Sequence, residues 1–346
     1  MSEDLNQRSQ NILEAIVKDY ISSAEPVGSR AISRKHALNL SPATVRNVMA
    51  DLEEMGFLCS PHTSAGRVPT SKGFHYYIDS LLEVRDLSDS EKARLTSSYQ
   101  FKGMRLEDAL QEVGRVLSGI SSYTGLVMAP RFSSTVFRQI EFLRLSHKRL
   151  LVIFVSKTGL VQNKVIESDV DWTPHQLENI TNYLNQTLHG LTIQEIRNQL
   201  SDEIQQERAR ASELQQQAMK LSQAALNAEV EDNVYVSGTT RILEQPEFSS
   251  PELIKKIFQT LESKQQLIEL LDQAQTADGV QIFIGSQSQH HAIEGCSLIS
   301  SPFSGKKGAI GTLGVIGPMR MDYSQVIPIV DFTAQLVSRV LERESE

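Results

Sequence analysis

The first eighty residues contain three short amphipathic helical patterns followed by two short strand patterns, and this order constrains the fold most. Apolar residues at helical spacing predict helices over 7–22 and from Ser29, as N-cap, to about His36. Ser41-Pro42 predicts the start of a third helix, which ends at Met55 before Gly56. Together with a following hairpin, these elements predict a winged helix-turn-helix whose third helix recognises DNA.

The outer face of this third helix carries side chains suited to a DNA major groove. Its apolar stripe is Val45, Val48, Met49, Leu52 and Met55, which leaves a polar face near the N-terminal end. Arginine pairs with guanine, asparagine pairs with adenine, and a threonine methyl contacts thymine. The predicted DNA-binding residues of the helical part are Ser29, Arg30, Ser41, Ala43, Thr44, Arg46 and Asn47.

A hairpin is predicted directly after the third helix. Residues 57–62 and 67–70 have strand character, and Thr63-Ser64-Ala65-Gly66 forms the tip, with glycine expected at positive φ. The predicted DNA contacts of this wing are His62, Thr63, Ser64, Gly66 and Arg67, the last on phosphate or in the minor groove. A fourth helix is predicted over 71–83.

Charge is unevenly distributed along the chain. The whole sequence has 34 basic and 42 acidic residues and a net charge of -8, which disfavours binding of a polyanion through global charge. From Gly28 to Ile78, however, six basic residues face only three acidic ones. The sequence therefore predicts a local DNA footprint that needs two modules bound together. The alternative is a winged helix that binds protein, or a plain helical core.

Three motifs resemble those of the bacterial heat-inducible transcription repressors called HrcA. They are Glu25-Pro26-Val27-Gly28-Ser29, the segment 63–79 that spans the predicted wing tip and fourth helix, and the glycine-rich segment 308–318 with Arg320-Met321-Asp322-Tyr323. His75 takes a position where the family commonly has arginine. The resemblance covers nearly the whole chain. It implies repression of chaperone operons at an inverted-repeat operator, and a chaperonin partner that keeps the repressor active.

The remaining residues predict an α+β multidomain protein. Residues 1–84 are the winged helix-turn-helix, and the polar stretch 85–104 is a linker with some helix. A helix over 106–120, strands near 136–145, 150–155 and 160–166, a helix after Pro174, late strands and a final helix follow. We therefore expect one domain over 105–192 and 278–346, which the resemblance implies is GAF-like.

The block 193–277 is too long for a loop and is predicted to be an inserted, mostly helical domain. A seven-residue pattern with small residues favours close pairing of helices. The resemblance implies that this insertion makes a homodimer, and the alternative is packing within one chain. The predicted dimerisation residues are Ile204, Ala211, Leu214, Ala218, Leu221 and Ala225.

Several function classes are disfavoured. Only Cys59 and Cys296 are present, so a disulfide framework is not expected, and both are predicted to be small buried side chains. The glycines of 308–317 do not match a nucleotide loop, and the adjacent His290 and His291 do not suit one metal ion. We expect no enzyme activity, cofactor or metal. The apolar runs are too short for a membrane span and no secretory signal is recognised, so we expect a cytoplasmic protein.

The leading functional hypothesis is a repressor of heat-shock chaperone operons that binds an inverted repeat as a homodimer and loses activity on heat stress. The alternative is a regulator that senses a small molecule in the GAF-like domain. In the first case warming alone releases the operator, and in the second a metabolite shifts operator affinity at constant temperature.

Overall fold

The N-terminal module is built of three helices around one apolar core. The computed structural model describes residues 5–36, 38–62, 66–99, 104–129, 135–157, 161–168, 170–196, 221, 234–249, 251–275, 279–285, 295–305 and 308–344. Helices α1 (Gln7–Ser23), α2 (Ser29–Lys35) and α3 (Pro42–Glu54) lie close to their predicted bounds. Gly28, and not Ser29, is the N-cap of α2.

A two-stranded hairpin follows α3, as the sequence predicts, but it is shorter. Strands β1 (Leu58–Cys59) and β2 (Val68–Pro69) pair antiparallel. The predicted fourth helix is divided, because α4 (Ser71–Tyr76) continues into a π-helical turn, η1 (Tyr77–Leu81). Helix α4 returns the chain to the core of the module, where Phe74 is fully buried.

The central module has a five-stranded antiparallel sheet. Its strands are β3 (Thr124–Met128), β7 (Val234–Ser237), β8 (Gln281–Ile284), β9 (Cys296–Gly305) and β10 (Gly308–Pro318), in the order β7-β3-β10-β9-β8. The neighbours β3 and β10 are far apart in the sequence, so long-range pairing closes the sheet.

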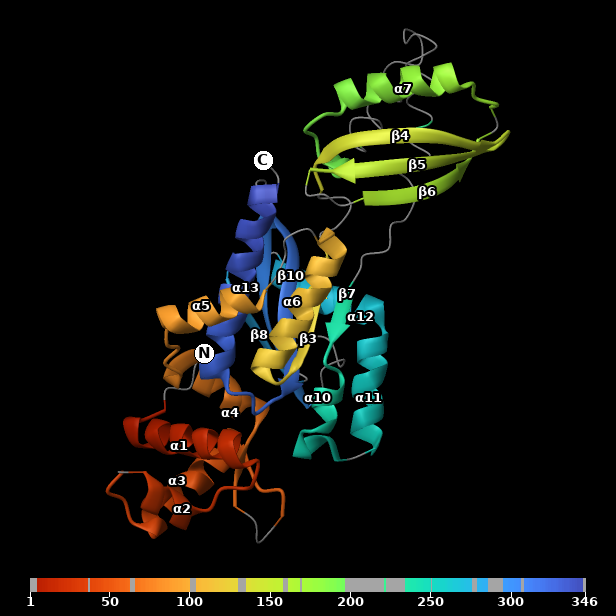
Figure 1. Cartoon of the computed structure of the whole chain (residues 1–346). Coiled ribbons are helices and arrows are strands. Elements are labelled where there is room, and N and C mark those ends of the chain that lie inside the picture. The colour runs from red at the N-terminus through yellow and green to blue at the C-terminus, as the bar shows by residue number, and fades with distance from the viewer. Residues whose placement is uncertain are drawn as a thin grey trace.

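Helices cover both faces of this sheet (Figure 1). One face packs against α6 (Leu106–Ser121) and α13 (Tyr323–Glu344), and the other against α12 (Lys264–Gln275), with α10 (Thr240–Leu243), η3 (Pro246–Ser249) and α11 (Pro251–Glu262) beside it. Side chains alternate between the faces along each strand, so Val127 joins one core cluster while Leu126 and Met128 join the other. Burial on both faces explains why the polar residues that do occur in β9 and β10 are small, such as Ser297, Ser300 and Thr312, which are themselves buried.

A second, three-stranded sheet stands apart from the first (Figure 1). Its strands β4 (Phe137–Ser146), β5 (Arg149–Ser156) and β6 (Val161–Glu167) form a meander in chain order, as the sequence predicts. Helix α7 (Pro174–Thr187) covers one face. Asn185 on α7 fixes this contact, because its side-chain amide exchanges hydrogen bonds of 2.8 and 3.1 Å with the backbone of Ile140.

This arrangement differs from the predicted division into 105–192 with 278–346 and an insertion of 193–277. Strands β4–β6 do not join the sheet of β3, whereas β7 pairs with β3 and α12 packs on β9 and β10. Hydrophobic spacing identifies strands but not their pairing partners, so the sequence alone did not assign these segments to a sheet. The α+β multidomain class is confirmed, and the GAF-like assignment stays a prediction.

The predicted linker contains helix α5 (Asp89–Ser98), which docks on the central module. Ser88 and Glu91 form a capping box at its start. At its end the buried Tyr99 hydroxyl lies 3.0 Å from Thr333 Oγ1 of α13. The described part of the linker is therefore attached to the central module through α5 and Tyr99.

The N-terminal module contacts the start of α13 directly. The rings of Phe74 and Tyr323 lie 6.3 Å apart between centroids. Arg320 donates to the carbonyl oxygen of Ile21 in α1 at 3.2 Å and to Gln245 Oε1 at 3.1 Å. The Arg320–Tyr323 motif thus lies at the boundary between the two modules.

Within the described ranges, none of the helices is long and apolar enough to cross a membrane.

Candidate nucleic-acid interface

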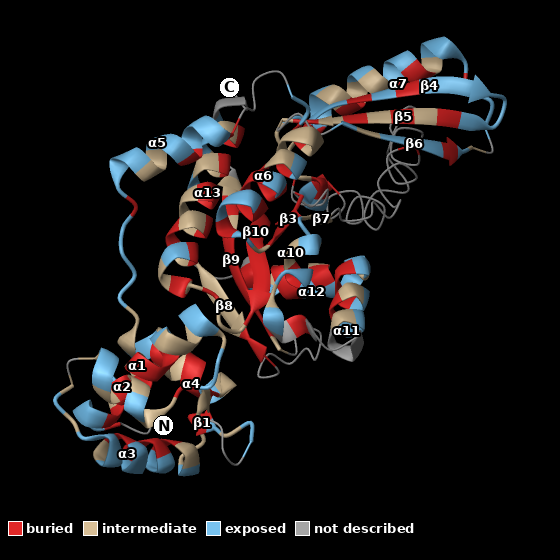
Figure 2. Ribbon diagram, turned by 60° about the horizontal axis from the view of Figure 1, so that its bottom comes forward, coloured by how far each residue is buried: buried red, intermediate tan, exposed pale blue. Residues whose placement is uncertain are grey.

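Helix α3 has one buried face and one exposed face, as predicted. Val45, Val48, Met49 and Leu52 are buried, whereas Ala43, Arg46, Asn47 and Ala50 are exposed and Thr44 is half-buried. Figure 2 shows the exposed side of α3 turned away from the rest of the molecule. The helix therefore presents its N-terminal half to solvent with its core side fixed.

The start of α3 is held by a cap. Ser41 Oγ accepts a hydrogen bond of 3.1 Å from the backbone N–H of Thr44 and lies 3.0 Å from Thr44 Oγ1. Pro42 occupies the first turn, where it requires no N–H partner. Capping by Ser or Thr contributes about 1 kcal/mol to a helix. Ser41 thus orders the end of α3 that carries the candidate contacts.

Arg46 and Asn47 have the side chains most available for DNA. Both are exposed, and across the described ranges neither side chain has a hydrogen bond or ion pair. Ser29 is half-exposed and Arg30 exposed at the start of α2, next to α3. Ala43 and Ala50 add little bulk to this surface.

Arg67 has a different environment from Arg46. Its Nε and Nη2 both lie 2.8 Å from Glu53 Oε2 of α3, and Nη1 donates to Ser60 Oγ at 3.3 Å. Its side chain is 27% exposed. The guanidinium therefore connects the wing to α3, and its charge is compensated by Glu53.

Gly66 is required by a close approach and not by positive φ. Its backbone is outside the left-handed region. A Cβ at Gly66 would lie 2.4 Å from the carbonyl oxygen of Val27, because Val27 and Arg67 exchange two backbone hydrogen bonds of 2.9 Å. The segment before α2 thus pairs with the wing, and the expectation of a positive φ at Gly66 was wrong.

The other predicted wing residues are only partly described. His62 is exposed, and its carbonyl oxygen accepts a 2.7 Å hydrogen bond from Ser60. Thr63 and Ser64 lie outside the described residues.

Cys59 is exposed, contrary to the expected burial, while Cys296 is buried as expected. Partial burial and the nearby Glu53 raise the pKa of the Cys59 thiol, which favours its protonated, unreactive form.

The predicted dimerisation residues fall almost entirely outside the described residues. Leu221 alone is described, and it is 3% exposed and belongs to the larger core cluster. Ile204, Ala211, Leu214, Ala218 and Ala225 lie in the part of the chain that the structure does not describe.

Sequence reasoning did not find the partners that hold the interface together. Glu53 and Ser60 bind Arg67, and Lys72 Nζ donates to the Met55 carbonyl at 2.9 Å and lies 4.4 Å from the centre of the Phe57 ring. Opposite charges on 53 and 67 were visible in the sequence. Their pairing was not, because it depends on how the hairpin folds back on α3.

A three-helix module with an exposed, capped third helix and a wing defines a winged-helix regulator of the kind that binds DNA. Residues 4–80 match the family model of the winged helix-turn-helix transcription repressor, HrcA DNA-binding, and residues 107–327 match that of the HrcA protein C terminal domain. The chain belongs to the HrcA family of heat-inducible transcription repressors, which are not enzymes.

Full-length relatives agree with this membership. The chain is 49% identical to a heat-inducible transcription repressor HrcA of Geobacter sulfurreducens, over 99% of both chains. It is 39% identical to that of Syntrophobacter fumaroxidans, again over 99% of each chain. A crystal structure described as a hypothetical protein is 22% identical over 99% of this chain and 100% of its own, with a TM-score of 0.64, which supports the fold alone.

Proposed function

We propose that this chain binds an inverted-repeat operator as a homodimer and represses heat-shock chaperone operons. The observation that carries the proposal is the exposed face of α3, where Arg46 and Asn47 project without partners in the described chain. A side chain already bound within the protein would have to break that bond to reach a base. Arg46 and Asn47 can contact a base without first breaking a hydrogen bond or ion pair within the described chain.

The proposed contacts divide into base recognition and positioning. Arg46 and Asn47 contact base edges, Ala43 and Thr44 contact thymine methyl groups, and Ser29, Arg30 and Ser41 contact backbone phosphates. The wing segment His62, Thr63, Ser64 and Gly66 lies along the neighbouring backbone. Arg67 contributes by fixing the wing to α3 through Glu53.

The modest local charge supports binding by two modules. Six basic residues between Gly28 and Ile78 face three acidic ones, so one module has little non-specific affinity. A twofold-symmetric dimer presents two recognition helices to two half-sites, and the second contact becomes intramolecular. An inverted repeat is the DNA symmetry that matches such a dimer.

The open face of the three-stranded sheet supports self-association. Opposite α7, the register aligns Leu143, Leu151 and Val165 in one cross-strand row. Leu143, Leu145, Val161 and Val165 are each between 47% and 54% exposed. Contiguous apolar surface of this kind marks protein contacts. We propose that this face contributes to the dimer alongside the predicted segment 193–277.

Heat control is proposed to act through stability. The free energy of unfolding of a folded domain is only about 5–15 kcal/mol. A small decrease in this free energy on warming therefore lowers the population of the active, folded protein. The family resemblance supports a chaperonin partner that keeps the repressor in its active form, and the cytoplasm is the location we propose for both. The alternative regulator would instead respond to a metabolite at constant temperature.

Selection of bound sequences from a random duplex pool tests the proposal. We expect the full chain to recover an inverted repeat whose half-sites are about one helical turn, or a multiple of it, apart. Recovery of a single half-site would contradict the dimer, and no enrichment would contradict base recognition. The recovered duplex, titrated with purified protein from growth to heat-shock temperature without metabolites, then tests heat control.

A further inference from the structure

A small cavity lies where the linker helix meets the central module. Its volume is about 170 Å³. It is lined by Arg85 and Leu87 of the linker, Glu91, Arg94, Leu95 and Ser98 of α5, Ile120 of α6, and Gln325 and Ile329 of α13. Drug-sized ligands occupy pockets of roughly 300–1,000 Å³, so this cavity suits a smaller molecule.

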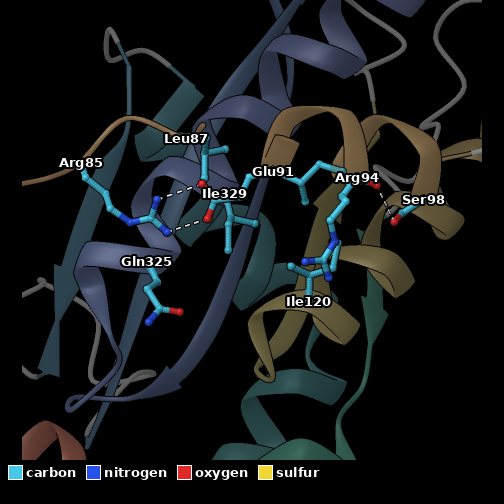
Figure 3. Close-up of a pocket in the computed structure, with 9 residues that line it drawn as sticks. Arg85, Leu87, Glu91, Arg94, Ser98, Ile120, Gln325 and Ile329 are labelled. Atoms are coloured by element: carbon cyan, nitrogen blue, oxygen red, sulfur yellow. Dashed lines mark hydrogen bonds and ion pairs between the residues drawn. The ribbon is translucent and has the colours of Figure 1, made fainter. Parts of the chain in front are cut away.

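The two arginines of the cavity differ in whether their guanidinium groups already have a partner within the protein. Arg85 forms a two-pronged ion pair with Glu91, with Nη1 and Nη2 donating at 2.9 and 2.7 Å. Hydrogen bonds from Arg85 and Ser88 hold the pKa of Glu91 well below its usual range, so the carboxylate stays ionised and the charge of Arg85 is compensated. Figure 3 shows this pair at one end of the cavity.

Arg94 lies at the other end with its guanidinium uncommitted. Its backbone carbonyl accepts from Ser97 and Ser98, but within the described chain its side chain has no hydrogen bond or ion pair. Figure 3 shows Arg94 extending toward Ile120, whose side chain is itself 39% exposed. One free cation is therefore set beside an exposed apolar side chain.

The remaining lining is apolar apart from the Gln325 amide and the Ser98 hydroxyl, which already donates to the Arg94 carbonyl oxygen. Leu87 and Leu95 are buried, Ile329 is half-buried, and the side chain of Gln325 has no hydrogen bond among the described residues. Because Arg85 and Glu91 compensate each other, Arg94 is the one uncompensated charge among the described lining residues. The lining thus fits one negative charge on a compact apolar body and does not fit a dianion.

We propose that this cavity binds a small monocarboxylate, with the carboxylate on Arg94 and the apolar body on Ile120 and Ile329. Guanidinium and carboxylate match in charge and in planar geometry, which makes the pairing specific. Bound there, the ligand contacts α5, α6 and α13 together, so it joins the linker to the central module. This inference does not rest on the operator or on the dimer.

Calorimetric titration of the full chain with benzoate and hexanoate at low ionic strength tests the proposal. We expect saturable binding of one ligand per chain for at least one of the two acids, and no binding of benzamide or hexanamide, which keep the shape but lack the charge. Hydrogen exchange of α5 is expected to slow when the acid is bound, because the ligand bridges α5 to α13.

Two substitutions that each remove one exposed arginine provide the matched control. Arg94→Gln is expected to weaken binding by about tenfold or more, since it removes a charge-assisted hydrogen bond. Arg138→Gln on the distant strand β4 is expected to leave affinity unchanged, and Arg94→Lys is expected to retain part of it. Thermal unfolding of each variant checks that the fold is intact.

Three results would overturn the inference. They are absence of saturable binding for both acids, equal affinity for the acid and its amide, and equal weakening by Arg94→Gln and Arg138→Gln. None of these results bears on operator binding, so the cavity and the proposed function fail separately.

Discussion

Arg46 and Arg67 lie in the same small module, yet their surroundings give them different roles. Arg46 is exposed on α3 without a partner in the described structure, whereas Arg67 is bound to Glu53 and Ser60. The sequence predicted DNA contact for both arginines. It shows the type and position of a residue, but it does not show which neighbouring side chain forms an ion pair with it. These contacts are why we propose a positioning role for Arg67, whereas the sequence predicted contact with phosphate or the minor groove.

Arg46→Ala is expected to weaken operator binding by about 1–3 kcal/mol and to relax discrimination at one base pair, because a base contact is lost. Titration of the selected operator and of its single-base variants measures both effects. Arg138→Ala on strand β4 serves as the control. An equal loss on random DNA would instead make Arg46 a phosphate contact.

Arg67→Ala is expected to weaken operator binding while leaving its salt dependence nearly unchanged, because Glu53 already compensates the charge. Operator affinity measured across a range of salt concentrations gives the slope. A slope smaller by about one would show that Arg67 leaves Glu53 and binds phosphate in the complex.

At the scale of elements, the helix boundaries of the N-terminal module were predictable from local signals. Ser41-Pro42 sets the start of α3 through a cap that involves only neighbouring residues. Strand pairing was not predictable in the same way. The alternating pattern of β4–β6 predicted a meander, but not that it forms its own sheet with an open apolar face, because that depends on which edge each strand meets.

Leu143→Asp, alone and with Val165→Asp, is expected to shift the protein from dimer toward monomer, because a charge in a buried apolar contact is costly. Sedimentation equilibrium measures the change. Leu243→Asp is the matched control, since Leu243 is 51% exposed on α10, away from this sheet. Dimers of unchanged stability in both sheet variants would remove this face from the proposed interface.

At the scale of the whole molecule, the Arg320–Tyr323 motif connects the N-terminal module to the core. Tyr323 is fully buried, and its hydroxyl donates to the Met319 carbonyl at 2.6 Å and lies 2.8 Å from Ser297 Oγ. Arg320 in turn reaches α1 and Gln245. These contacts hold the DNA-binding module in one orientation relative to α13.

Arg320→Ala is expected to loosen this connection, at a cost of about 1–2 kcal/mol, because charge-assisted hydrogen bonds at a half-buried site are lost. Faster hydrogen exchange at the end of α1, and loss of operator binding at a lower temperature, are the expected results. Arg339→Ala, farther along α13, is the control. Unchanged exchange in α1 would show that other contacts, such as Phe74 with Tyr323, carry the connection.

The sequence by itself determined the helices of the N-terminal module, the exposed face of α3 and the α+β class, because caps, glycines and helical periodicity act over a few neighbouring residues. Only the tertiary structure decided that Arg67 binds Glu53, that Gly66 lies against Val27, that β7 joins the central sheet and that α12 packs on it. Each of these contacts joins two segments that are separated along the sequence and meet only in the folded protein. Their free energy depends on the shape and charge of a partner that no local pattern specifies.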